Sequence, residues 1–283
     1  MTGRWVRSGD RRARWPKRLT IGGAIVGSLV VLMAVGWFWT PFPPGRIAIS
    51  SRLLPPLQGG LLGTDHFGRD VLSSLMVGAW NSLSVAFVSV ALGGIAGTCV
   101  GVGVAAAGGA GDRFVMRVCD VLFAFPPIIS AMMLAAVLGP GRSAAIVAIA
   151  VFMVPVFARV ARGSALQVLA QPYVSAARSM GKRTTGILLD HVLPNIAGQL
   201  AVQTALQLGL AILTEAGLSF LGLGAPPPTP SWGRMLAESQ TYLTQAPWLA
   251  IVPGATIALA VLGLNLLGDG LRDRFDPHAA TRH

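Results

Sequence analysis

One long apolar stretch decides the fold class of this chain. Residues 71–111 read VLSSLMVGAWNSLSVAFVSVALGGIAGTCVGVGVAAAGGAG and hold no Asp, Glu, Lys or Arg. A membrane-spanning helix needs about 20 mostly apolar residues, because the hydrocarbon core of a bilayer is about 30 Å thick. The stretch is therefore long enough to cross a membrane, and we expect its span at residues 82–107.

The composition of the whole chain agrees with this interpretation. Of the 283 residues, 53% are hydrophobic and only 12% are charged, whereas an ordinary soluble domain has roughly a quarter charged residues. A soluble enzyme, a disordered tail and a secreted disulfide scaffold are thereby excluded. Cys99 and Cys119 lie in or beside apolar runs, so we expect buried thiols rather than a disulfide.

Five further charge-poor runs follow the same pattern. Together with the first, they predict an all-α polytopic membrane protein with six transmembrane helices. The expected spans are residues 19–39, 82–107, 118–138, 143–160, 196–216 and 247–267. They divide the chain into a basic N-terminus (1–18), the first helix (19–39), an external segment (40–81), a transmembrane core (82–267) and a C-terminal tail (268–283). The core includes a cytoplasmic loop (159–194) and an external loop (217–246).

The basic residues predict the orientation of these spans. Seventeen Lys and Arg fall on the side that holds both termini and five on the other side. Because cytoplasmic loops are enriched in Lys and Arg, both termini are expected in the cytoplasm. The net charge of +11 sits at the edges of apolar runs, which indicates contact with lipid and not with nucleic acid. The first apolar run exceeds a signal-peptide core and lacks an A-x-A cleavage site, which favours a retained span.

Residues that could perform chemistry are few. Gly181-Lys182 lacks the upstream glycine and the following Ser or Thr of a phosphate-binding loop, so no nucleotide is expected in this chain. The four histidines lack metal-ligand spacing, and no catalytic set can be assembled, so neither a metal site nor an enzyme is predicted. Glu215 is expected near membrane depth, and Asp269 near the cytoplasmic end of the last span. These are too few ionisable residues within the spans for an ion relay. Glu215 therefore needs a polar or cationic partner, in a structural or a substrate-binding role.

Small residues recur at helical spacing in the second span. Gly93, Gly97 and Gly101 are four residues apart, and such a stripe lets a second helix approach closely. A dinucleotide-binding loop is disfavoured here because no strand precedes the glycines.

The cytoplasmic loop has the form of two short helices joined at a glycine. Ala176 and Ala177 give a low helical surface, Gly181 supplies a stop, and Pro194 is expected to end the second short helix. Such a loop fits a groove on a partner protein or lies on lipid, and the residues alone leave both open.

This loop resembles that of the inner-membrane permease subunits of binding-protein-dependent ABC importers, which reads E-A-A, three residues, G, nine residues, I-x-L-P. Ala176, Ala177, Gly181, Leu193 and Pro194 match at that spacing. Ser175 stands where the family has glutamate, and His191 where many members have isoleucine. The resemblance implies that these seven positions form the loop that couples the permease to its ATPase.

Other segments resemble the second permease of the dipeptide, oligopeptide and nickel branch. The external motif reads GTDHFGRDVLS from residue 63, and its matching residues are Gly63, Thr64, Asp65, Gly68, Arg69 and Asp70. Further matches read EAGLSFLGLG from residue 215, SWG from 231 and NLLGDGLRD from 265. Asp65, Arg69 and Asp70 are expected to form an ion-pair cluster that holds the external segment together, with direct substrate contact as the alternative.

The resemblance implies a function and a set of partners. The chain would pair with a homologous permease, two ATP-binding subunits and an external substrate-binding lipoprotein in a bacterial inner membrane, and ATP would bind to the partners. Di- or oligopeptides are the expected solutes, with nickel or another small solute as the alternative. An ion-coupled secondary carrier that works alone is the rival from another class.

Overall fold

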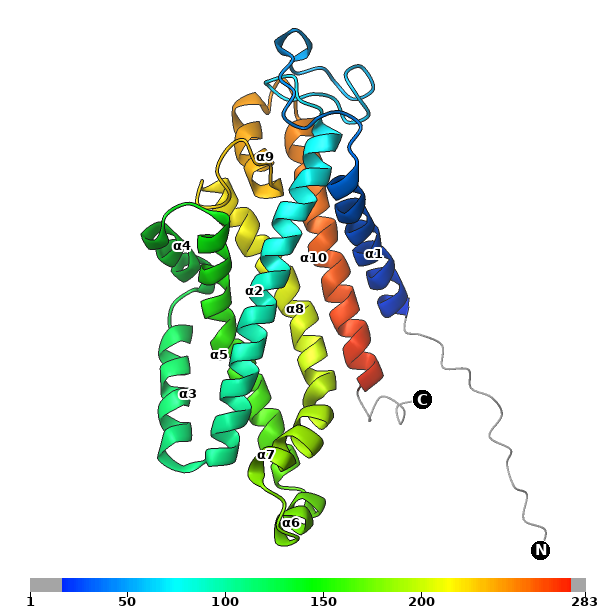
Figure 1. Cartoon of the computed structure of the whole chain (residues 1–283). Coiled ribbons are helices and arrows are strands. Elements are labelled where there is room, and N and C mark those ends of the chain that lie inside the picture. The colour runs from blue at the N-terminus through cyan, green and yellow to red at the C-terminus, as the bar shows by residue number, and fades with distance from the viewer. Residues whose placement is uncertain (1–16, 276–283) are drawn as a thin grey trace, which may run out of the picture.

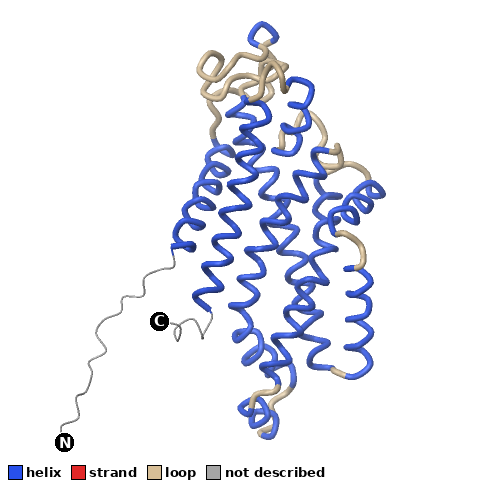
Figure 2. The backbone as a smooth tube through the Cα atoms, turned by 180° about the vertical axis from the view of Figure 1, so that it is seen from behind, coloured by secondary structure: helices blue, strands red, loops and turns tan. Residues whose placement is uncertain are grey.

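The structure is a computed structural model that describes residues 17–275, and in that range it is helical without strands (Figures 1 and 2). The helices are α1 (Lys17–Phe38), α2 (Val71–Ala107), α3 (Gly109–Phe123), α4 (Pro127–Leu138), α5 (Arg142–Leu169), α6 (Pro172–Ser179), α7 (Thr184–Ile187), α8 (Leu193–Phe220), α9 (Trp232–Ser239) and α10 (Trp248–Phe275). Short 3₁₀ turns occupy Ile49–Ser51 and Gln240–Tyr242, and a π-helical turn occupies Leu188–Val192. The expected all-α fold is confirmed.

Within residues 17–275, five helices are long and apolar enough to cross a membrane, and a bent pair makes a sixth candidate. The five are α1, α2, α5, the continuous run Thr184–Phe220, and α10. The third expected span, 118–138, is not one straight helix, because α3 and α4 meet at 89°. Pro126 and Pro127 cause the break: proline ends the helix before it, and Pro127 then begins α4.

Two helices extend beyond the expected spans, and one expected helix end was wrong. The second helix begins at Val71 and not at residue 82, because the Asp70 carboxylate accepts a hydrogen bond from the Ser73 amide and caps the helix. The fourth extends to Leu169 and not to residue 160, so it projects into the expected cytoplasmic loop. Pro194 ends no helix: it lies in the first turn of α8, where its missing N–H costs little, and the π-helical turn joins α7 to α8.

The connecting segments separate to the two ends of the bundle (Figure 1). The start of α1, the α2–α3 turn, α6, α7 and the end of α10 lie toward one end. The irregular segment 39–70, the start of α5 and α9 lie toward the other end. This is the alternation expected for the two sides of a membrane. Most of the basic N-terminus, residues 1–16, and the tail from residue 276 lie outside the described residues.

The centre of the bundle is the packing of α2 against α5. Gly93, Gly97 and Gly101 all lie on the α5 side of α2, and a Cβ atom on any of them would meet backbone atoms of α5. A Cβ on Gly97, for example, would lie 2.8 Å from Phe157 Cβ, well inside the contact distance of about 3.5–4 Å. The glycine stripe therefore sets how closely the two helices approach.

Candidate functional site

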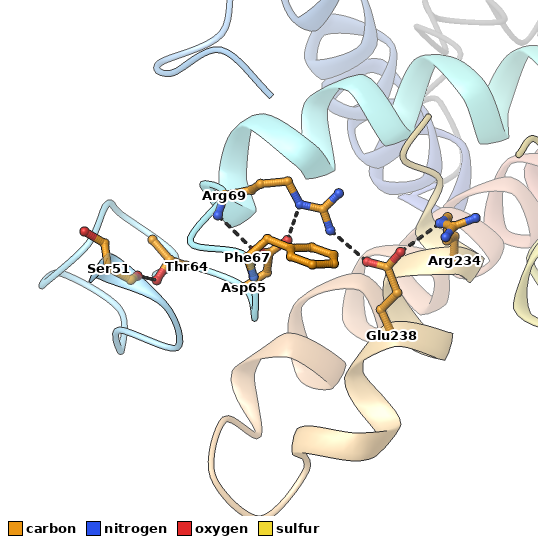
Figure 3. Close-up of polar contacts among 7 residues, drawn as sticks. All are labelled: Ser51, Thr64, Asp65, Phe67, Arg69, Arg234 and Glu238. Carbon is orange, nitrogen blue, oxygen red and sulfur yellow. Dashed lines mark hydrogen bonds and ion pairs between the residues drawn. The ribbon is translucent and has the colours of Figure 1, made fainter. Parts of the chain in front are cut away.

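The external motif is organised around the side chain of Asp65 (Figure 3). Its Oδ1 atom accepts hydrogen bonds from the backbone amides of Phe67 and Arg69, each at 2.8 Å, so the carboxylate closes a turn in the motif. Its Oδ2 atom receives the Arg69 Nε donor at 2.5 Å. Asp65 thus fixes both the backbone and the side chain of Arg69.

Arg69 joins the external segment to α9 through Glu238, which lies 169 residues further along the chain. Its Nη2 atom lies 2.9 Å from Glu238 Oε2, and Glu238 Oε1 accepts from Arg234 Nε at 2.8 Å. The four side chains, which Figure 3 draws in a row, alternate in charge and are 14–26% exposed. Because the charges are partly shielded from water, these ion pairs are stronger than fully exposed ones. Sequence reasoning missed Arg234 and Glu238, since no local pattern links them to Arg69.

Asp70 has a different role from the one expected. It makes no ion pair among residues 17–275; its Oδ2 atom accepts from the amide and hydroxyl of Ser73, at 2.7 and 2.6 Å. The expected cluster of Asp65, Arg69 and Asp70 therefore contains the first two residues and not the third.

The remaining motif residues shape the backbone of the external segment. Thr64 Oγ1 donates to the Ser51 carbonyl at 2.5 Å and accepts from the Leu54 amide at 3.0 Å. Gly63 and Gly68 have φ values of +79° and +76°, which favour glycine. A Cβ on Gly68 would also overlap the backbone of Ala48.

The helix α9 is held in the bundle by Trp232, which is fully buried. Its indole Nε1 donates to the Leu75 carbonyl at 3.1 Å, and its amide donates to Ser82 Oγ at 3.2 Å. Asn81 Nδ2 also donates to the Pro230 carbonyl at 2.7 Å. These contacts tie α9 to α2, so the external segment, α9 and α2 form one connected unit. The S-W-G motif was the sequence signal for this position.

Glu215 lies beneath this unit and is 3% exposed. Its Oε1 atom accepts from Ser219 Oγ at 2.6 Å, and Ser82 is a second polar side chain beside it. Its Oε2 atom has no hydrogen-bond partner in the described part of the chain. The carboxyl group therefore has a polar partner, as expected, but no cationic one among residues 17–275.

At the opposite end, α6 and α7 form the helix–glycine–helix loop. Gly181 between them has φ +83°, and the Lys182 side chain then holds the turn against the next helix. Lys182 Nζ lies 2.9 Å from Asp190 Oδ2 and 3.1 Å from His191 Nε2.

The two alanines of this loop face different environments. Ala177 is buried against the chain's own residues together with Val174, whereas Ser175 and Ala176 are exposed. A partner could reach Ser175 and Ala176 but not Ala177. Leu193 and Pro194 belong to the start of α8, and Asp269 on α10 lies 3.9 Å from Arg18 on α1.

Among the described residues, one group of side chains has ligand atoms close enough together for a metal ion. Single ligand atoms of Asp65, His66 and Glu238 lie within 4.8 Å of one another. Both carboxylates already pair with Arg69, and Glu238 also pairs with Arg234. A divalent cation would have to displace these arginines, so the arrangement fits an ion-pair network better than a metal centre.

Comparisons with known proteins agree with this architecture. The family described as "Binding-protein-dependent transport system inner membrane component" matches residues 97–281. The chain is 40% identical to the glutathione transport system permease protein GsiD of Pectobacterium atrosepticum, over 94% of this chain and 90% of that protein. It is 39% identical to the probable D,D-dipeptide transport system permease protein DdpC of Escherichia coli K12, over 93% and 89%.

A solved structure shows the same fold. A chain of the MetNI methionine ABC transporter, in an inward-facing conformation, matches with a TM-score of 0.58 and 21% sequence identity, covering 71% of this chain and 96% of that one. The resemblance drawn from the loop and external motifs is thus confirmed. The chain belongs to the family of inner-membrane components of binding-protein-dependent transport systems: it is a multi-pass permease of an ABC importer and not an enzyme.

Proposed function

We propose that this permease forms half of the membrane pathway of an importer for short peptides. The observation that supports this solute class is the near full-length identity of about 40% to permeases named for glutathione and for D,D-dipeptides. Both named solutes are short peptides or peptide derivatives with free carboxylates. Nickel or another small solute is the alternative within the same branch.

The proposed partners follow from the family and from the two ends of the bundle. A homologous permease would complete the pathway, and an external lipoprotein would deliver solute to the end that carries segment 39–70 and α9. Two ATP-binding subunits would engage the exposed face of α6, where Ser175 and Ala176 are accessible. ATP would bind to those subunits only, and both termini would be cytoplasmic, as the basic residues indicate.

The proposed mechanism uses the rigid connections of the chain. Movement of the ATPase subunits would be passed to α6 and, through the Lys182 contacts, to the start of α8. At the far end, α8 lies against α9, because a Cβ on Gly233 would meet the Ala216 carbonyl group. A shift of α8 would therefore move α9 and change access to the pathway from outside.

Uptake by the reconstituted importer tests the solute. The permease pair, the ATPases and the binding protein are placed in proteoliposomes, and uptake of labelled glutathione, a dipeptide and Ni²⁺ is compared with ATP inside. Peptide uptake that exceeds Ni²⁺ uptake supports the proposal. Ni²⁺ uptake without peptide uptake would show that the solute assignment is wrong while leaving the permease assignment intact.

A further inference from the structure

An open groove with polar groups lies between the inner halves of α8 and α10. Its volume is about 440 Å³, and it is lined by Gly198, Gln199, Val202, Gln203, Leu206, Arg272 and Phe275. None of these residues belongs to the coupling loop, the external motif or the glycine stripe. Among the described residues that line it, one side chain is charged, the guanidinium of Arg272, and none is acidic.

The side-chain hydrogen-bond donors of this groove have no partners in the described part of the chain. Within residues 17–275, neither Arg272 nor Gln203 has a hydrogen-bond or ion-pair partner. Gln199 uses its Oε1 atom as an acceptor for Ser164, which leaves its amide NH₂ group available. The nearby carboxylate of Asp269 is directed to Arg18 on α1. A guanidinium and two amides that all offer N–H groups favour an anionic ligand with several acceptor oxygens, such as a phosphate.

The groove lies at the edge of the apolar part of the bundle. About 20 helical residues cross a hydrocarbon core. Counted back along α8 from Phe220 and forward along α10 from Trp248, that length ends near Gln203 and Arg272. The helix ends around it carry Lys17, Arg18, Arg272 and Arg274 against Asp269 and Asp273. This level and this charge are those of a lipid headgroup region.

The surface further along the same two helices is apolar. Leu206 belongs to the groove, and Leu213 and Phe220 follow at intervals of seven residues on α8, all at least 37% exposed. Leu213 and Phe220 also line a second hollow, of about 210 Å³, together with Gly254 and Ile257 of α10. A route for a hydrophilic peptide would need polar groups here, whereas an acyl chain fits this surface.

From these observations we infer that the α8–α10 groove binds the headgroup of an anionic phospholipid. Arg272 pairs with the phosphate, Gln199 and Gln203 donate to its remaining oxygens, and an acyl chain lies along Leu206 and Leu213. Binding of this lipid would hold the inner ends of α8 and α10 together. The inference concerns a lipid and does not depend on which solute is transported.

Native mass spectrometry of the complete importer tests the inference. The complex is prepared in nanodiscs that contain phosphatidylglycerol and phosphatidylcholine in equal amounts, and the retained lipids are counted for the wild type, Arg272→Gln and Arg183→Gln. Arg183 precedes α7 and does not line the groove, so its variant controls for the loss of one charge. We expect Arg272→Gln to lower the retained ratio of phosphatidylglycerol to phosphatidylcholine about tenfold, and Arg183→Gln to leave it unchanged.

The other outcomes would each overturn the inference. Equal retention in all three proteins would exclude Arg272 from a lipid site. Release of phosphatidylglycerol when glutathione or a dipeptide is added would assign the groove to the solute route. Retention by the isolated chain but not by the assembled importer would show that a partner subunit covers the groove.

Discussion

Replacing Gly97 by alanine tests whether the approach of α2 to α5 depends on the glycine stripe. The new Cβ atom would lie 2.8 Å from Phe157 Cβ and 3.0 Å from the Ala158 amide nitrogen, and closest to the Val154 carbonyl oxygen. Two of these three atoms belong to the α5 backbone and cannot rotate away. The helices must therefore move apart by several tenths of an ångström or more.

The size of the effect follows from two opposing contributions. Overpacking a close contact costs about 1–3 kcal/mol, while alanine gains about 0.5–1 kcal/mol over glycine in a helix. Gly103 lies on the same helix, and a Cβ atom there would have no neighbour within 4 Å, so Gly103→Ala has the second contribution without the first. We expect the two variants to differ by about 1–3 kcal/mol, which is the cost of overpacking alone.

The assay is unfolding of the purified protein in mixed micelles, followed by circular dichroism as the denaturing detergent is increased. Gly97→Ala should unfold at the lower detergent fraction, and Gly103→Ala at or above that of the wild type. Equal midpoints for the two variants would refute the role of the stripe in packing.

Three further predictions concern the two ends of the bundle. Glu238→Gln should loosen the external segment from α9, because hydrogen bonds to charged groups contribute about 1.5–3 kcal/mol. Proteolysis within residues 40–70 should then become several-fold faster. Unchanged proteolysis rates would contradict the link between Glu238 and Arg69. Gly181→Val should leave the spans inserted yet remove ATPase co-purification or transport, because valine is strained at φ +83°. Gly181→Asn should retain both, because asparagine tolerates this conformation. Normal transport by the valine variant would disprove the loop assignment. Glu215→Gln should preserve assembly and the range of solutes, because the buried carboxyl group bonds within its own chain, and an altered solute range in uptake assays would show a substrate-binding role instead.

The sequence predicts the spans well where an apolar run coincides with one helix. It fails where a cap or a proline decides the boundary: Asp70 starts α2 eleven residues early, and Pro126 and Pro127 bend an apolar run that hydropathy cannot distinguish from a straight one. Both signals are present in the sequence, since Asp before an apolar run is a helix cap and a Pro-Pro pair interrupts a helix. The expected spans followed the length of the apolar runs instead of these two local signals.

For the candidate sites too, the sequence predicted some features and missed others. Local features such as the Asp65–Arg69 pair and the stop at Gly181 were expected from short motifs, and the resemblance identified the family. The Arg69–Glu238 pair joins residues 169 positions apart, and the groove at Arg272 needs two helices side by side. Such contacts arise from packing alone, so no spacing in one sequence indicates them.

The central claim is that this chain is a permease driven by the ATPases of an importer. The most direct test is peptide uptake into proteoliposomes that hold the complete complex, with ATP supplied inside, compared with a complex whose ATPase subunits bind but cannot hydrolyse ATP. The account predicts uptake only with hydrolysis and only when the binding protein is present outside. Uptake by the permease without ATPase subunits, driven by an ion gradient, would contradict it and favour a secondary carrier.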